Sequence, residues 1–381
     1  MTTTISTFVT DMANSTTNDT SDDANVSDST LTEAPYNMWA DPDNYVEHRI
    51  AVALWKYLCP VVILIGVVGS VLTIMVMQGT GMKRTTPSVY LTFLATADAL
   101  TLLTGALRHW INYSWEIDIR DLMAWICKTH HFVLYLCIHL SGWLLVAVSI
   151  DRVITVYLPL QARFISTKRN ALIISTTMVI ILGAINSHWF LTYSVSFNYG
   201  ELYCQFQPIF EDSFDLRVWM WVDLALSSAL PFLILIVSNI MISVQLARVS
   251  KQRNEMGSGG NDNSRSMTVM LLSISVVFVC LTLPMAVYLT TQSFSYEYEN
   301  SQAIWRDEMT YAIVSNIAYI NNAINFFLYC VSGSKFRGEL AKLCGKKKSR
   351  KANNQSMSVT RMTGVSESRQ SVKTVTSELQ K

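Results

Sequence analysis

Three ionisable residues, Asp98, Arg108 and Asp223, lie within long apolar stretches of the sequence. Ionisable side chains are costly inside a membrane, so they usually face a protein interior or a water-filled cavity and mark a functional site. A carboxylate or guanidinium group there can bind an ion or a charged group of a ligand. A further charged pair, Asp151-Arg152, stands at the end of another apolar stretch, where a surface ion pair alone would contribute little.

Enzymatic and metal chemistry are disfavoured by what the sequence lacks. It contains no H-E-x-x-H, no G-x-S-x-G and no paired-carboxylate site. His130 and His131 could ligate a metal, but we find no Cys or carboxylate at metal-ligand spacing with them. A transporter or channel would need an inverted repeat, broken helices or a charged pathway, and none is visible. We therefore expect no enzyme, no metal and no cofactor.

The elements that must position these residues are membrane helices. Half of the 381 residues are hydrophobic and 15% are charged, whereas a soluble domain has about 25% charged residues. A membrane crossing takes roughly 20 apolar residues, and seven stretches meet this length. We expect an all-α membrane protein, a seven-transmembrane helix bundle with spans near 52–78, 86–110, 125–157, 170–193, 217–247, 266–292 and 308–331.

Charge indicates which end of the bundle faces the cytoplasm. Residues 1–48 hold nine acids and no Lys or Arg, whereas the tail after 334 has twelve basic residues and three acids. Successive linkers between the spans alternate between basic and acidic, beginning with a basic one. Lys and Arg stay on the cytoplasmic side of a membrane protein. We therefore expect a plasma-membrane protein with an extracellular N-terminus and a cytoplasmic C-terminus. No nucleic-acid partner is expected, because the net charge is only +1.

The polar ends of the chain predict two flanking segments. Residues 1–47 form an expected disordered leader with glycosylation sequons at Asn14, Asn18 and Asn25, and without a cleavable signal peptide. Asn112 begins a fourth sequon close to the membrane. Residues 48–345 form the expected membrane domain, and 346–381 an expected disordered, Ser/Thr-rich regulatory tail. Cys344, just past a short amphipathic stretch, suits palmitoylation and contact with membrane lipids.

Two of the seven cysteines fall on the predicted outer side. Cys127 begins the third span and Cys204 lies in the second outer linker. Disulfides form in oxidising compartments, so we expect these two cysteines to pair and to pin that linker over the bundle.

Several motifs together carry a family resemblance. The third span ends in Asp151-Arg152-Val153, and Arg152 stands 25 residues after Cys127. The second span contains an L-A-x-A-D motif, Leu94-Ala95-Thr96-Ala97-Asp98. The seventh span ends in Asn325-Phe326-Phe327-Leu328-Tyr329, similar to N-P-x-x-Y, and Phe336-Arg337 follows. Pro231 and Pro284 occupy the expected places in spans five and six. The whole membrane domain resembles rhodopsin-like (class A) G-protein-coupled receptors.

The resemblance implies roles for particular residues. It implies that Asp151, Arg152, Val153, Pro159 and Leu160 couple to a heterotrimeric G protein. It implies an activation core, with a bound sodium ion, and it implies arrestin and receptor kinase as partners of the tail. The expected members of the activation core are Asp98, Ser141, Asn321, Asn325, Tyr329, Phe278 and Pro284. For Asp98 the alternative is a protonated side chain held by hydrogen bonds.

Departures from the family pattern affect the switches rather than the fold. Thr282 stands where the family often has Trp, and Phe278, one turn away, is the expected replacement as a packing switch. Ser264 stands where an acid often pairs with the Arg of span three, so that inner ionic lock is not expected.

The ligand side of the resemblance favours a peptide. Leu134 stands where amine receptors carry Asp, and Tyr319 stands where opsins carry the retinal Lys. The run Asn321–Cys330 resembles invertebrate neuropeptide receptors of the FMRFamide and myosuppressin type, so the expected ligand is an extracellular, amidated peptide. A non-peptide ligand such as a lipid stays an alternative. The expected pocket residues are polar or aromatic, apart from Leu134: Arg108, His109, His131, Leu134, Tyr135, Asp223, Tyr288, Tyr311 and Tyr319.

Asp223 and Arg108 have two interpretations. They could pair with each other or with neighbours and only hold the bundle together. Alternatively, Asp223 takes a basic side chain of the ligand and Arg108 takes a ligand carbonyl or positions the peptide end. The acidic leader and outer linkers would concentrate a cationic peptide.

Overall fold

The computed structural model describes residues 42–83, 85–198, 201–207, 219–256, 262–292 and 301–345, without side chains at 253–256, 262–267 and 301. The sequons at Asn14, Asn18 and Asn25 and the tail beyond 345 lie outside the described residues. The chain divides into two units, residues 1–340 and 341–381. The helix bundle belongs to the first unit.

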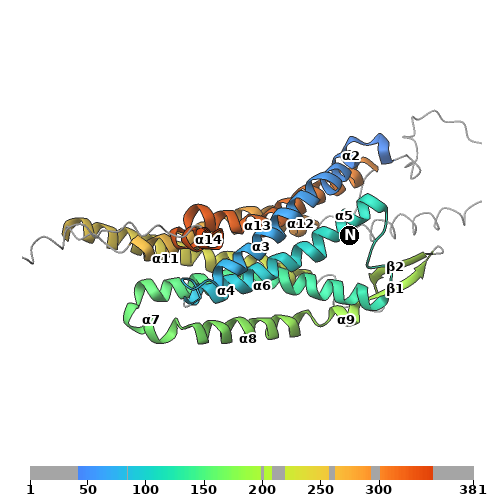
Figure 1. Cartoon of the computed structure of the whole chain (residues 1–381). Helices are drawn as coiled ribbons and strands as arrows, with labels where there is room; N and C mark the ends of the chain where they lie inside the picture. Colours follow the sequence, from blue (N-terminus) through green and yellow to red (C-terminus); the bar gives the residue numbers. More distant parts are fainter. Residues whose placement is uncertain are drawn as a thin grey trace, which may run out of the picture. The chain divides into compact units, whose positions relative to one another are not determined.

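Seven long helices make up the described part of this unit (Figure 1). The first joins α2 to α3 and the second joins α4 to α5, each through a short π-helical turn. The bounds are α2 Val46–Ala53, α3 Cys59–Met77, α4 Thr86–Thr101, α5 Leu107–Trp115, α6 Ala124–Tyr157, α8 Lys168–Asn186, α10 Met220–Leu224, α11 Leu230–Met256, α12 Asp262–Gln292 and α13 Ser301–Ser332. Shorter helices are α7 Pro159–Ile165, α9 Trp189–Thr192 and α14 Ser334–Leu343.

Six of the seven long helices are long and apolar enough to cross a membrane. The seventh, α13, falls outside that set, although it is 32 residues long. Its sequence is more polar, because it carries Asn316, Asn321, Asn322 and Asn325. Three of these asparagines are buried, so α13 turns its polar residues toward the bundle.

Local sequence signals set where several helices begin. Proline occupies the first turn of α4 and of α7, where its missing N–H costs no hydrogen bond. Thr167 caps α8, and its side-chain oxygen accepts the backbone N–H of Asn170 at 3.2 Å. Pro284 lies inside α12.

A β-hairpin marks one end of the bundle. Strand β1 (Tyr193–Asn198) pairs antiparallel with β2 (Glu201–Phe206), and Val195 lies opposite Cys204. We call this end the hairpin end. The helix α7 lies at the opposite end, which we call the α7 end (Figure 1).

π-helical turns interrupt three of the long helices, at Leu54–Leu58, Leu102–Ala106 and Ala225–Ala229. Each widens one turn of the helix, so side chains beyond it point in directions that a regular α-helix would not give them. Pocket candidates Arg108 and His109 follow the second of these turns, and Asp223 precedes the third.

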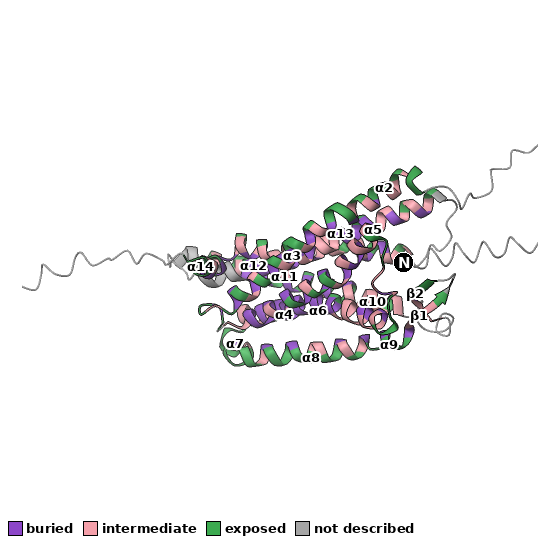
Figure 2. Ribbon diagram, turned by 45° about the vertical axis from the view of Figure 1, so that its right-hand side comes forward, coloured by how far each residue is buried: buried purple, intermediate pink, exposed green. Residues whose placement is uncertain are grey.

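Helix α6 is the centre of the packing. It contacts α4, α8, α11 and α12, and its ribbon is largely buried, whereas α8 is exposed along much of its length (Figure 2). The main apolar core runs through α6 and includes Leu144, Leu94, Leu235 and Phe278. The exposed faces of the long helices carry Leu, Ile and Val, as a helix surrounded by lipid requires.

Candidate functional site

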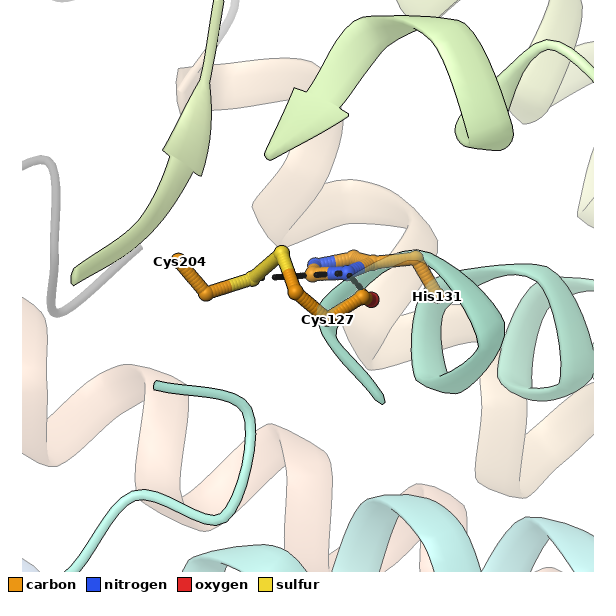
Figure 3. Close-up of side chains that lie close together, drawn as sticks. All are labelled: Cys127, His131 and Cys204. Atoms are coloured by element: carbon orange, nitrogen blue, oxygen red, sulfur yellow. Dashed lines mark hydrogen bonds between the residues drawn. A yellow bond between two sulfur atoms is a disulfide. The ribbon is translucent and has the colours of Figure 1, made fainter. Parts of the chain in front are cut away.

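The predicted disulfide joins Cys127, at the start of α6, to Cys204 in β2 (Figure 3). Both residues are buried, and the bond ties the hairpin to the bundle. His131 lies one turn after Cys127, and its Nδ1 is 2.8 Å from the Cys127 carbonyl oxygen. Its other ring nitrogen lies 3.4 Å from an Arg120 guanidinium nitrogen.

The structure corrects the expectation that no cysteine lies at metal-ligand spacing with these histidines. Side-chain atoms of Cys127, His131 and Cys204 all lie within 4.8 Å of one another (Figure 3). Both sulfurs are bonded to each other, and a metal needs the free thiolate. This cluster is therefore a disulfide packed against an imidazole.

Arg108 pairs with a neighbour at the hairpin end. Its guanidinium nitrogens bind both oxygens of Asp118, at 2.6 to 3.1 Å, and Arg120 binds the same carboxylate at 2.7 Å. Both arginines are buried. Burial alone would raise the pKa of Asp118, but hydrogen bonds from Arg120 and Arg108 and their charges hold this pKa well below its usual range.

The neighbouring carboxylate, Asp121, reaches the hairpin. Its Oδ1 accepts the backbone N–H of Cys204 at 2.6 Å. Burial raises the pKa of Asp121, and that hydrogen bond opposes the rise. The loop between α5 and α6 is thus bonded to α5, to α6 and to β2.

Asp223 binds a buried histidine rather than Arg108. Its Oδ1 lies 2.9 Å from Nε2 of His139 in α6. The other ring nitrogen of His139 lies 3.0 Å from the amide nitrogen of Asn186 in α8. Three helices therefore meet in one polar contact below the hairpin.

The predicted aromatic residues form two groups at the hairpin end. In one, His109 stacks on Trp55 at 4.2 Å, and Tyr311 lies between His109 and Tyr288, at 5.8 and 5.9 Å between ring centroids. In the other, Tyr135 stacks on Trp189 at 4.5 Å.

Tyr319 and Leu134 approach each other across Gly105, within the second π-helical turn. A Cβ atom on this glycine would lie 2.5 Å from the Tyr319 hydroxyl and 2.9 Å from Leu134 Cδ1. All nine predicted pocket residues therefore lie in the half of the bundle next to the hairpin, though in separate contacts.

The residues expected to form the activation core include Asp98, which is 1% exposed. Its carboxylate accepts the Ser141 hydroxyl at 3.0 Å and the Asn325 amide N–H at 2.8 Å. Asn321 is buried as well, but no hydrogen bond joins it to Asp98 within the described residues. The Phe278 ring packs against Gly142, where an added Cβ atom would lie 3.4 Å from the tip of the ring. The centroid of the Phe278 ring lies 6.0 Å from that of Phe232.

The α7 end holds the predicted coupling residues. Arg152 donates to Asp151, and the second Asp151 oxygen accepts the Ser166 hydroxyl at 2.5 Å. Thr86 of α4 donates to the Ser166 carbonyl at 2.8 Å. Pro159 and Leu160 are exposed on α7 and Val153 is half-buried.

Two residues link α13 to its successor. Tyr329 is buried, and its ring lies 5.4 Å from that of Phe336 in α14. In the second unit, Cys344 is exposed.

Sequence reasoning missed several partners. His139, Asn186 and Ser166 were not singled out, and Asp118 and Arg120 were counted only as loop charges. A second clasp was also missed: Glu308 accepts Tyr113 Oη at 2.7 Å and lies 2.8 Å from His48 Nδ1. A signal existed for His139, since an ionisable residue in the middle of an apolar span is a candidate in its own right.

Comparison with known proteins gives partial matches to several receptors. The chain is 32% identical to mouse galanin receptor type 3 over 146 residues, which is 37% of this chain and 39% of that receptor. It is 31% identical to human galanin receptor type 2 over 116 residues, 29% of this chain and 28% of that receptor. It is 28% identical to the chimpanzee (Pan troglodytes) probable G-protein coupled receptor 34 over 209 residues, 52% of each chain. The chain thus spans about half or less of each of these three relatives.

A family match covers more of the chain. Residues 69–329 match the family described as 7 transmembrane receptor (rhodopsin family), which is more than half of the 381 residues. The matched region contains the Asp98 core, the disulfide and the Asp151-Arg152 pair. Members of this family are receptors and not enzymes. The chain belongs to the rhodopsin family of seven-transmembrane receptors.

Proposed function

We propose that this receptor binds an extracellular, amidated neuropeptide and signals through heterotrimeric G proteins. The observation that carries the ligand part is Asp223, a carboxylate in a membrane helix near the hairpin end, 15% exposed in its side chain. A carboxylate in lipid is costly, so Asp223 faces the bundle interior, where it can accept a basic group of a peptide. Similarity to galanin receptors supports a peptide ligand.

The orientation we propose places the hairpin end outside and the α7 end in the cytoplasm of a plasma-membrane receptor. The acidic residues 1–48 and the basic residues after 334 support it. In this arrangement residues 1–47 are a glycosylated leader, 48–345 the receptor domain and 346–381 a regulatory tail. The tail's serines and threonines would recruit arrestin once a receptor kinase has phosphorylated them, and palmitoylated Cys344 would contact lipid.

The ligand subclass we propose is FMRFamide-like. It rests on the resemblance of Asn321–Cys330 to invertebrate neuropeptide receptors. Two guanidinium nitrogens of Arg108 donate to the Asp118 carboxylate. We therefore propose that Arg108 holds the outer loop in place and that Asp223 binds the ligand.

Signalling would follow from a shift in population. A peptide that binds one state better than another shifts the balance only by that difference in affinity. We propose that the favoured state opens the α7 end and releases Arg152 from Asp151 toward the G protein, with Val153, Pro159 and Leu160 shaping the contact. Arg152→Ala should therefore bind peptide but not stimulate nucleotide exchange.

Asp98 is the proposed sodium site. Hard cations prefer oxygen ligands. The Asp98 carboxylate lies 3.0 Å from the Ser141 hydroxyl and 2.8 Å from the Asn325 amide nitrogen, so the residues fit such an ion. Sodium there would add a positive charge beside the buried carboxylate and favour the resting arrangement.

The test is a screen of amidated peptides in cells that express the receptor, read as G-protein nucleotide exchange. We expect responses to FMRFamide-like peptides and a loss of potency in Asp223→Asn at unchanged surface expression. Thr96→Ser, which keeps a hydroxyl group on the exposed face of α4, is the control and should leave potency unchanged. A response to lipids and to no peptide would overturn the peptide assignment.

A further inference from the structure

A chain of three polar side chains runs from α8 through α6 to α10. Asn186 is fully buried, His139 is fully buried, and Asp223 follows with its carboxylate. The amide nitrogen of Asn186 lies 3.0 Å from His139 Nδ1, and His139 Nε2 lies 2.9 Å from Asp223 Oδ1. Within the described residues, His139 is the hydrogen-bonding partner of the Asp223 carboxylate.

Two further contacts fix which way the Asn186 amide points. Its nitrogen donates to the Leu182 carbonyl at 2.9 Å, and its oxygen accepts the Trp189 indole N–H at 3.4 Å. A flipped amide would place its oxygen against that carbonyl and its N–H₂ against the indole N–H. Both contacts would then be repulsive, so the amide nitrogen must face His139.

The amide in turn fixes the proton on His139. A donor N–H from Asn186 requires Nδ1 to be an acceptor, so Nδ1 carries no hydrogen. The neutral imidazole then carries its hydrogen on Nε2, where it donates to Asp223. The ring contributes a hydrogen bond to Asp223 but no positive charge.

We propose that Asn186 is a positioning residue that keeps His139 neutral, so that Asp223 retains an uncompensated negative charge for a cationic group of the ligand. This inference rests on the proposed function for the identity of the ligand, but not for the state of His139. The second Asp223 oxygen is the acceptor for an ammonium or guanidinium group, and His139 orients the first. A doubly protonated His139 would instead form an internal ion pair and cancel that charge.

The state of His139 is tested without any ligand. Nitrogen-15 histidine spectra of the purified receptor in nanodiscs at neutral pH report the protonation of each ring nitrogen, and His139→Gln identifies the His139 signals among the six histidines. We expect Nε2 protonated and Nδ1 unprotonated. Asn186→Asp supplies only acceptors, so it should protonate both nitrogens, whereas Asn170→Asp, at the far end of α8, should change nothing. Two protonated nitrogens in the unaltered receptor, or an unchanged spectrum in Asn186→Asp, would overturn the proposal.

The charge itself is tested with a peptide and its neutral analogue. The probes are Phe-Met-Arg-Phe-amide and the same peptide with citrulline in place of arginine, compared by potency in nucleotide exchange. A charged hydrogen bond should give the unaltered receptor about a tenfold preference for arginine. Asn186→Asp should abolish the preference, and His139→Gln, which donates but cannot become cationic, should keep it.

The double variant separates protonation from damage to the fold. In Asn186→Asp with His139→Gln no imidazole is present to be charged, so the arginine preference should return. A preference that stays lost in the double variant would overturn the proposal. If neither peptide activates the unaltered receptor, the FMRFamide-like ligand assignment fails, and the spectra still decide the state of His139.

Discussion

Asp98, which is buried, and Asp118, which is half-buried, take different roles from their partners. Asp98 is bound by neutral donors, Ser141 and Asn325, whereas Asp118 is bound by two guanidinium groups. Neutral donors leave the carboxylate with its negative charge, which can bind a cation. Two arginines beside a carboxylate give the group a net positive charge instead. Asp98 therefore suits an ion site, and Asp118 suits a structural cross-link.

Asp118→Asn should strongly destabilise the receptor. It would leave Arg108 and Arg120 buried beside each other without a counter-charge, and breaking a buried pair costs on the order of 3–5 kcal/mol. We expect a lower unfolding temperature of the purified receptor. Glu116→Gln, an exposed carboxylate in the same loop, is the control and should unfold like the unaltered receptor.

The same carboxylate predicts a pH dependence. Its folded pKa lies below its usual range, so its contribution to stability is present above the unfolded pKa, roughly 3.9, and is lost as pH falls through the folded pKa. The difference in unfolding temperature between the unaltered receptor and Asp118→Asn should stay constant from neutral pH to about pH 5. A difference that already shrinks between those two values would show that Asp118 is not held ionised by the arginines.

At this scale the sequence predicts motif residues and misses their partners. Contacts of Asp98 with Ser141, Asn321 and Asn325 were expected, and hydrogen bonds join it to Ser141 and Asn325. The motifs of spans two and seven contain both Asp98 and Asn325. Asn186 and His139 belong to no motif, and their contact needs the rotation of α6, α8 and α10 to be known. Arg108 was recognised as costly in lipid, but Asp118, ten residues later, became its partner through a loop whose path no periodicity predicts.

At the scale of elements, helix positions were predictable and helix rotation was not. Seven apolar stretches gave the seven helices to within several residues, since length and hydropathy are local. The apolar stretch near 217–247 placed Asp223 close to the beginning of its helix. The π-helical turn at Ala225–Ala229 changes the direction of its side chain, and nothing in the residue pattern predicts that turn.

Gly105, in the second π-helical turn, should not accept a side chain. An added Cβ would lie 2.5 Å from the Tyr319 hydroxyl and 2.9 Å from Leu134, and overpacking typically costs about 1–3 kcal/mol. Gly105→Ala should lower the unfolding temperature. Gly142→Ala is the matched control, because its nearest neighbour would lie at 3.4 Å, and alanine also favours a helix by about 1 kcal/mol. Equal stability of the two variants would contradict this packing.

The helix α7 holds the Asp151-Arg152 pair through Ser166, which binds Asp151 and is itself bound by Thr86. Ser166→Ala would remove one hydrogen bond, about 0.5–1.5 kcal/mol net, from the resting arrangement. If activation separates Arg152 from Asp151, basal nucleotide exchange should rise several-fold. Ser273→Ala, at a half-buried serine bonded within its own helix, should leave basal exchange unchanged. If basal nucleotide exchange in Ser166→Ala equals that of the control, the Ser166 contact plays no part in holding the resting state.

At the scale of the whole molecule, the hairpin end is one bonded layer. The disulfide joins α6 to β2, Asp121 joins the preceding loop to the same residue of β2, and Asp118 joins that loop to α5 through Arg108. The sequence predicts the disulfide, because both cysteines lie on one side of the membrane. It does not predict that Asp121 reaches Cys204, since the two residues are 83 positions apart.

Because two of these bonds converge on Cys204, their contributions should not be additive. The disulfide closes 77 residues of chain, and losing such a bond costs roughly 2–5 kcal/mol. Once the Cys127→Ser/Cys204→Ser variant releases β2, the Asp121 carboxylate no longer has a fixed backbone N–H to accept. Asp121→Ala, which removes the acceptor, should therefore lower the unfolding temperature of the disulfide-bonded receptor but have little further effect on the receptor without the disulfide. Independent sites would give equal effects in both backgrounds, and that result would mean that the disulfide does not hold β2 against Asp121.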